Sequence, residues 1–164
     1  MLPQRVWDRF LAIGLYTLIA LGMVWLGGRM INVALDAGFY NDFLSGWEVA
    51  LIKYRHQSGR YPEFKGGNHK KYMQKLVGAM RRSLVPPPKS NTDQPFVYSI
   101  DKIGRKAERV FVLVLSDRMV LYNLPPKTTR MLDKVIDGEL DFTTGHFTAR
   151  VSKDGMTYIG IWKL

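Results

Sequence analysis

The chain has 164 residues, no cysteine, and 24 lysine and arginine residues against 14 acidic ones, which gives a formal net charge of +10. Without thiols it cannot form disulfides, Fe–S clusters, cysteine-ligated zinc sites or a thiol nucleophile. The length suits one domain of modest size beside a membrane segment. The positive charge favours anionic partners such as lipid headgroups, nucleic acid or acidic protein surfaces.

An uncharged run extends from Phe10 to Gly28. As a helix this run rises about 28 Å, close to the ~30 Å thickness of a hydrocarbon core. Trp7 and Trp25 stand near its two ends, where tryptophan side chains reach the headgroup layers. The run is longer than the apolar part of a signal peptide, and no clear cleavage site follows it. We therefore expect a retained transmembrane helix.

Positive charges flank this run unequally. Arg5 and Arg9 precede it, whereas Arg29 is the one basic residue that closely follows it. The positive-inside rule then favours a cytoplasmic N-terminus and an external C-terminal domain. The expected organisation is an N-terminal segment with its membrane helix at residues 1–28 and a soluble domain at residues 29–164.

Apolar residues continue past the run at alternating gaps of three and four, which keeps one face of a helix apolar. We expect helix from Arg29 to about Gln57, ended by a cap at Ser58-Gly59. The apolar face should pack on a sheet, with Trp47 and Leu51 buried. Its members are Met30, Val33, Ala37, Tyr40, Leu44, Trp47, Leu51 and Tyr54.

A second helix is predicted after a glycine-rich loop. Asn68 is a good N-cap, and the prolines at 86–88 end the helix. The predicted apolar face of this helix is made of Tyr72, Met73, Leu76, Val77, Met80 and Leu84.

From Pro95 onward the pattern becomes that of strands, expected at 96–100, 110–115, 118–124, 146–151 and 156–162. Ser116-Asp117 and Ser152–Gly155 have the composition of hairpin turns. Residues 129–136 are ambiguous and could form one short helix. Strands that follow helices and are joined by hairpins indicate an α+β domain, in which a long N-terminal membrane-spanning and amphipathic helix packs on an antiparallel sheet.

Basic residues are dense between Lys53 and Arg82, where Glu63 is the lone acid. Tyr54, Tyr61 and Tyr72 are interleaved with them, a pattern that suits stacking on single-stranded nucleic acid, although Tyr54 fits the core better. The alternative is a solvated basic face that keeps the domain soluble. The candidate basic patch comprises Lys53, Arg55, Arg60, Lys65, Lys70, Lys71, Lys75, Arg81 and Arg82.

No catalytic or cofactor site is predicted. The three histidines are scattered, and no Ser/His/Asp set, carboxylate pair or phosphate-binding loop is recognisable. Acidic residues gather at Asp133, Asp137, Glu139 and Asp141, where Ca²⁺ could bind, but the EF-hand pattern is missing, and a solvated turn or a subunit contact is the preferred interpretation. We expect neither a metal nor an enzyme.

This plan resembles the type IV pilin and type II secretion pseudopilin superfamily, whose members have a membrane helix that continues as an amphipathic helix and then an antiparallel sheet. Residues 50–62, with Ala-Leu, Tyr, Gly and Tyr-Pro in that order, are similar to the end of the pseudopilin helix. Residues 136–145 resemble the family's Asp-Asp-Gly-Asn-x-x-x-Gly segment before the last strands. The resemblance implies a pilin-like fold and a role in a filament.

The sequence departs from that family at the processing site. Pilin precursors carry Gly before the first mature residue, a Phe, and Glu five positions into the mature chain. Here Phe10 follows Arg9, and Gly14 stands where Glu is expected. The departure predicts that the first nine residues are retained and that small residues support association in the membrane. The candidate helix-packing and assembly residues are Phe10, Gly14, Gly22, Tyr40, Leu44, Trp47 and Leu51.

Two functions follow as hypotheses. The first is a structural or accessory subunit of a type II secretion pseudopilus or type IV pilus-like machine, in the bacterial inner membrane with its C-terminal domain in the periplasm. Its partners would be other pilin-like subunits, in homo- or hetero-oligomers, and inner-membrane assembly proteins. The second is a single-pass anchored binding module whose basic patch docks nucleic acid, anionic lipid or an acidic protein partner.

Overall fold

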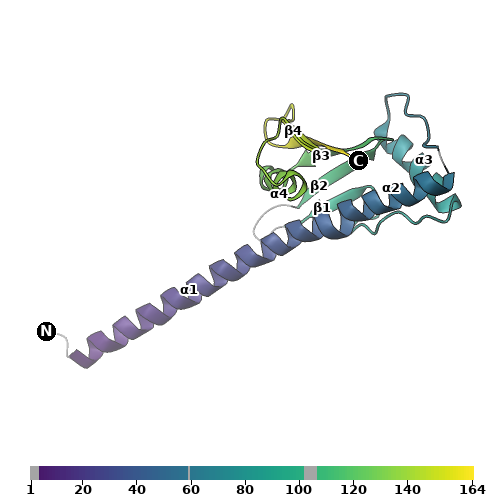
Figure 1. The fold of residues 1–164 in the computed structure, drawn as a ribbon. Coiled ribbons are helices and arrows are strands. Elements are labelled where there is room, and N and C mark those ends of the chain that lie inside the picture. The colour runs from purple at the N-terminus through teal and green to yellow at the C-terminus, as the bar shows by residue number, and fades with distance from the viewer. Residues whose placement is uncertain (1–3, 59, 102–106) are drawn as a thin grey trace. The chain divides into compact units, whose positions relative to one another are not determined.

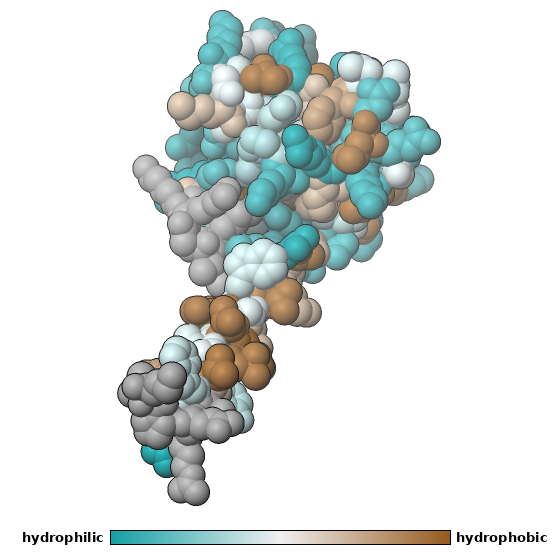
Figure 2. All heavy atoms as spheres, turned by 90° about the vertical axis from the view of Figure 1, so that its left-hand side faces the viewer, coloured by the Kyte–Doolittle hydropathy of each residue, from teal (hydrophilic) through white to brown (hydrophobic). Residues whose placement is uncertain are grey.

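The computed structural model describes the backbone of residues 4–58, 60–101 and 107–164 (Figure 1). The chain forms two units, one that ends at Ala34 and one from Leu35 to Leu164. The first unit is made of helix α1, Gln4–Gly38, up to Ala34. Its apolar side chains point outward all round, and it is long and apolar enough to cross a membrane. Figure 2 shows these apolar side chains on the helix.

Two further helical elements continue α1 without a break. They are η1, a π-helix at Phe39–Leu44, and α2, Ser45–Ser58. The helix predicted over 29–57 is therefore confirmed, but the π turn was not predicted. The N–H of Ser45 donates to the carbonyl of Tyr40, five residues back, so the turn is wider than in an α-helix. The proposed cap at Ser58-Gly59 includes Gly59, which lies outside the described residues.

The wide turn changes which side chains enter the core. Phe39 and Phe43 are fully buried, although neither belonged to the predicted apolar face. The predicted members from Leu44 to Tyr54 are buried as expected. Met30 and Val33 are 73% and 63% exposed, so the prediction that the sheet covers this part of the face is wrong. Their position explains the difference, because both precede the folded unit.

A five-stranded antiparallel sheet forms the centre of the folded unit, in the order β1-β2-β3-β5-β4. The aromatic rings of η1 contact one face of it: Phe43 lies 4.9 Å from Tyr98, and Tyr40 lies 6.0 Å from Trp162, between ring centroids. The α+β prediction is confirmed. The strands are β1 Val97–Ile100, β2 Glu108–Val114, β3 Arg118–Leu124, β4 Phe147–Val151 and β5 Tyr158–Lys163.

Helix α3, His69–Arg82, begins at the predicted cap, where the side chain of Asn68 accepts a hydrogen bond of 3.0 Å from the N–H of Lys71. The predicted apolar face is buried except for Leu84, which is 88% exposed. Leu84 has a φ of 57° and lies beyond the helix. The next residue, Val85, is buried instead and donates to the carbonyl of Met80, which closes the helix end.

The ambiguous segment at 129–136 forms a helix, α4, Pro126–Asp137, whose first residue suits the N-terminal turn. The hydroxyl of Thr128 donates to a carboxylate oxygen of Asp36 at 2.8 Å, which joins α4 to the part of α1 inside the folded unit. Both predicted hairpins are present. Leu115 and Arg118 pair across the first turn, and Gly155 has a φ of 69° in the second.

Candidate functional site

The predicted assembly residues divide between the two units. Phe10 is 62% exposed, and a Cβ added at Gly14 or Gly22 would meet no atom within 4 Å. This segment therefore presents an apolar surface with two shallow positions, where the backbone of another helix can approach closely. Within a bilayer, such a surface can pack against lipid or against a second transmembrane helix.

The remaining predicted assembly residues lie inside the folded unit. Leu44, Trp47 and Leu51 are buried in the core, and Tyr40 is half-buried against Trp162. Their packing partners are therefore within the same chain, on the sheet and the neighbouring helices.

All nine side chains of the basic patch are exposed. Lys53 and Arg55 lie on α2, Arg60 and Lys65 on the following loop, and the other five on α3. The part of α3 that the solvent reaches has no acidic residue. These cations are accessible to solvent, and their binding of a ligand stays a prediction.

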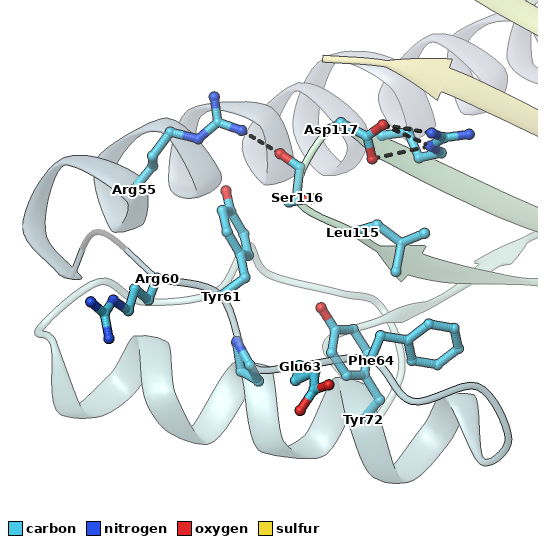
Figure 3. A pocket seen from close by; sticks show the side chains of 11 residues that line it. Arg55, Arg60, Tyr61, Glu63, Phe64, Tyr72, Leu115, Ser116 and Asp117 are labelled. Carbon is cyan, nitrogen blue, oxygen red and sulfur yellow. Dashed lines mark hydrogen bonds and ion pairs between the residues drawn. The ribbon is translucent and has the colours of Figure 1, made fainter.

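Part of the basic patch borders a cleft of about 740 Å³ (Figure 3). The cleft lies between the end of α2, the loop that follows it, the start of α3 and the turn between β2 and β3. Its floor combines apolar and aromatic groups with three arginines at the margin. The lining residues are Arg55, Arg60, Tyr61, Pro62, Glu63, Phe64, Tyr72, Leu115, Ser116, Asp117 and Arg118.

Arg55 joins two walls of this cleft. Its Nη2 donates to the backbone carbonyl of Ser116 in the hairpin turn, and its guanidinium carbon lies 5.8 Å from the ring centroid of Tyr61. The hydroxyl of Tyr61 donates to the carbonyl of Leu51 at 3.3 Å, and its ring meets that of Tyr54 edge-on. These contacts fix the guanidinium at the mouth of the cleft, where it can still meet an anion.

The tyrosines of the cleft are neutral at physiological pH. Burial raises the pKa of Tyr72 to about 12, with smaller contributions from Tyr61 and Tyr54. Burial also raises the pKa of Tyr61, although the charge of Arg55 offsets part of this effect. The cleft therefore gains no negative charge from its phenols.

The other two arginines differ in their partners. Arg118 forms a two-pronged ion pair with Asp117, the shortest N–O distance being 2.6 Å. Arg60 makes no ion pair or side-chain hydrogen bond with the described part of the chain. Lys65, just outside the cleft, pairs loosely with Glu63 at 3.6 Å. Among the arginines of the cleft, Arg60 thus has the most guanidinium donors available to bind a carboxylate or phosphate.

Two acidic residues, Asp137 at the end of α4 and Asp141 in the exposed loop after it, accept hydrogen bonds from neighbouring groups. The carboxylate of Asp137 accepts hydrogen bonds of 2.8 Å from the N–H groups of His146 and Phe147. Asp141 accepts from both Thr143 and Thr144, and the Thr143 hydroxyl is the main cause of its lowered pKa of about 2. Of the four acidic residues for which a solvated turn or a subunit contact was preferred, Glu139 and Asp141 lie in an exposed turn. Asp133 and Asp137 belong to α4, and Asp133 is buried, so the prediction of a solvated turn is wrong for Asp133.

One carboxylate near this loop is buried. Asp133 on α4 has no exposed surface, and neither of its oxygens accepts a hydrogen bond of ordinary geometry from the described residues. Burial raises its pKa, the nearby charges of Asp137 and Asp141 raise it further, and the N–H of Asp141 offsets part of the effect. Among the described residues no group of three or more potential ligands is arranged to hold a metal ion.

Sequence reasoning missed the hairpin side of the cleft. Ser116 and Asp117 were recognised as a turn, but no sequence signal places this turn beside Arg55 and Tyr61, because the contact joins segments 61 residues apart. A comparison with known proteins adds no assignment, since no family model, curated protein or solved structure matches the chain.

Proposed function

We propose that the chain is a pilin-like subunit, structural or accessory, of a type II secretion pseudopilus or a type IV pilus-like machine. It would be anchored in the bacterial inner membrane by α1, with the folded unit in the periplasm. Its role would be to contribute its helix to a bundle of similar helices while the sheet and its loops form the outer surface.

One observation carries this proposal. A single helical segment supplies both an exposed apolar length that can cross a membrane and a buried length in the core of an antiparallel α+β domain. A domain that is built on the continuation of its own anchor cannot be separated from that anchor without loss of core residues such as Phe43 and Trp47. The similarity of residues 50–62 and 136–145 to pseudopilin segments supports the same assignment.

The exposed part of α1 supplies the means of assembly. Gly14 replaces the Glu whose charge helps pilin subunits to associate, so helix packing would have to supply the attraction. The open surfaces at Gly14 and Gly22 permit close approach of a second helix.

The test is recovery of neighbouring chains with the full-length protein from its native membrane in mild detergent. The proposal predicts recovery of other single-pass chains with an N-terminal apolar helix, and a strong loss of that recovery when Gly14→Leu and Gly22→Leu are combined. Leu18→Met, a change on the same exposed helix, is the control and should keep the partners. Recovery of the chain alone, or with nucleic acid only, would contradict the proposal and favour the binding module.

A further inference from the structure

We propose that the folded unit docks on a second copy of itself head to tail, with the acidic loop at residues 138–141 of one copy in the arginine-lined cleft of the next. This inference rests on the proposed function as a subunit of an assembly. It adds the residues through which the folded units would meet.

The cleft has the chemistry of a receptor for an acidic, partly apolar segment. Arg60 has no partner among the described residues, and Arg55 is held at the mouth by Ser116. Figure 3 shows the ring of Tyr61 beside these two cations, and the ring of Tyr72 and the side chain of Leu115 further along the walls. A ligand that combines carboxylates with an apolar group would satisfy both features.

The loop after α4 has the complementary chemistry. Leu140 is 64% exposed and stands between two exposed acidic residues, Glu139 and Asp141. Gly138 with a φ of 81° starts the loop, and the hydrogen bonds of Asp141 to two threonines hold its end. Because the loop is already ordered, its docking would lose little conformational entropy.

The two surfaces cannot meet within one molecule. Thr128 ties α4, which leads into the acidic loop, to Asp36, whereas the cleft begins at Arg55. The two positions on the helix are nineteen residues apart, about 28 Å along its axis. Figure 1 shows α4 and α3 at different ends of the sheet. A contact between unlike surfaces of two copies repeats from copy to copy, so it builds a ring or an open chain of subunits rather than a two-fold dimer.

The absence of natural cysteine permits a direct test by cross-linking. Two full-length variants, Arg60→Cys and Leu140→Cys, are given tags of different size, produced together in the same membrane and oxidised. The proposal predicts a disulfide-linked pair that contains one chain of each kind. The side chains of Leu140 and Arg60 are both exposed, so both variants should fold.

Charge reversal shows whether the contact has the proposed chemistry. Adding Glu139→Lys to the Leu140→Cys chain should lower the yield of the mixed pair about tenfold, because attraction becomes repulsion. Adding Arg55→Glu to the Arg60→Cys chain should restore much of that yield when the two changed chains are combined. Lys153→Cys, on the exposed turn between β4 and β5, replaces Leu140→Cys as the matched control and should give no mixed pair with Arg60→Cys.

The results that would overturn the inference are equally specific. They are a mixed pair as abundant with Lys153→Cys as with Leu140→Cys, or no mixed pair at all. Retention of the chain on DNA or on anionic vesicles that Arg55→Glu abolishes, without a mixed pair, would assign the cleft to another partner. A Gly14→Cys variant tests association through α1 alone. If it forms cross-links while the Arg60→Cys and Leu140→Cys pair does not, the inference about the cleft fails and the proposed function as a subunit stands.

Discussion

The two ends of one continuous helical segment differ in what covers their apolar side chains. Between Phe10 and Ala34 the large apolar side chains are exposed, whereas between Phe39 and Tyr54 many are completely buried. The first stretch includes an uncharged run and the second carries charged residues as well as an apolar face, and only the second lies in the folded unit. Helical periodicity therefore shows that a partner is needed and does not show whether the partner is lipid, another helix or the chain's own sheet.

The boundary between these regions coincides with an irregular turn. The π-helix at Phe39–Leu44 begins four residues after the folded unit starts. It brings Phe39 and Phe43 into the core together with Leu44, a set that regular α-helical geometry does not place on one narrow face. The wider turn lets the helix meet the sheet with a broad aromatic surface.

The largest expected difference between the two regions is in the change of stability when a large apolar side chain is truncated to alanine. Leu51→Ala should lower the free energy of unfolding of the folded unit by about 2–5 kcal/mol, because it leaves a cavity in a closely packed core. Met30→Ala, on the same predicted face but exposed, should change it by less than about 0.5 kcal/mol. Denaturation of the full chain in detergent, followed by near-UV circular dichroism, measures both. Equal effects would show that the apolar face has one environment along its whole length.

Replacement of glycine by alanine, which adds a methyl group, should also affect the two regions differently. A Cβ at Gly160 would lie 2.8 Å from the side chain of Leu124 and 2.9 Å from the ring of Phe147, so Gly160→Ala should destabilise the folded unit by about 1–3 kcal/mol. Gly14→Ala meets nothing within 4 Å and should leave this stability unchanged. The same denaturation experiment gives both values. A neutral Gly160→Ala would mean that the sheet tolerates more space at this position than its contacts allow.

Replacement of leucine by glycine should have opposite effects on stability in the two regions. Leu84 has a left-handed backbone that disfavours side chains, so Leu84→Gly should stabilise the folded unit by about 1 kcal/mol. Leu84→Ala keeps the Cβ and should give no such gain. In α1, Leu21→Gly should instead reduce helix stability by about 1 kcal/mol, seen as lower helicity of the chain in detergent. Destabilisation by Leu84→Gly would show that its exposed side chain makes a contact.

The smallest predicted effect is a pH dependence confined to the folded unit. Burial raises the pKa of Asp133 above its ordinary value of 3.8, so the folded state holds this proton more tightly than the unfolded state. Its contribution to stability should be most favourable at low pH and should fall as pH rises through the interval between the two pKa values. Asp133→Asn should remove this part of the slope and raise the melting temperature at neutral pH.

Asp154 serves as a control because its pKa is shifted in the opposite direction. Hydrogen bonds from the hydroxyl and N–H of Thr157 and from the N–H of Met156 lower its pKa, so its contribution should be lost as pH falls through the lowered value. Melting curves from acidic to neutral pH distinguish the two residues. An unchanged slope in Asp133→Asn would show that the buried carboxyl has a partner that compensates its charge.

The features that the sequence predicts well are local. Asn68 caps its helix through the N–H of Lys71, three residues away, and the turn at Ser152–Gly155 needs only a glycine that can adopt a positive φ. The prediction for Leu84 failed by one position, because the helix closes through Val85 and Met80 and so buries the valine. Capping chemistry acts within one or two turns and is visible in a short stretch of sequence.

The candidate site depends on contacts between distant segments. The basic residues were recognisable by composition, but the cleft exists because the hairpin turn at Ser116 meets Arg55 and Tyr61. Likewise, the acidic pattern between residues 133 and 141 did not show that Asp133 would be buried and Leu140 exposed. Such arrangements follow from how the sheet is placed against the helices, which no short pattern encodes.

The most direct test of the proposed anchored subunit is the side of the membrane on which each region lies. Lys153→Cys places one thiol on the exposed β4–β5 turn of a chain without other cysteines. With outer access opened and the inner membrane intact, a membrane-impermeant maleimide should label it without lysis, whereas Gln4→Cys should react only after lysis. Labelling of Lys153→Cys that requires lysis would place the folded unit in the cytoplasm and contradict the pilin-like function.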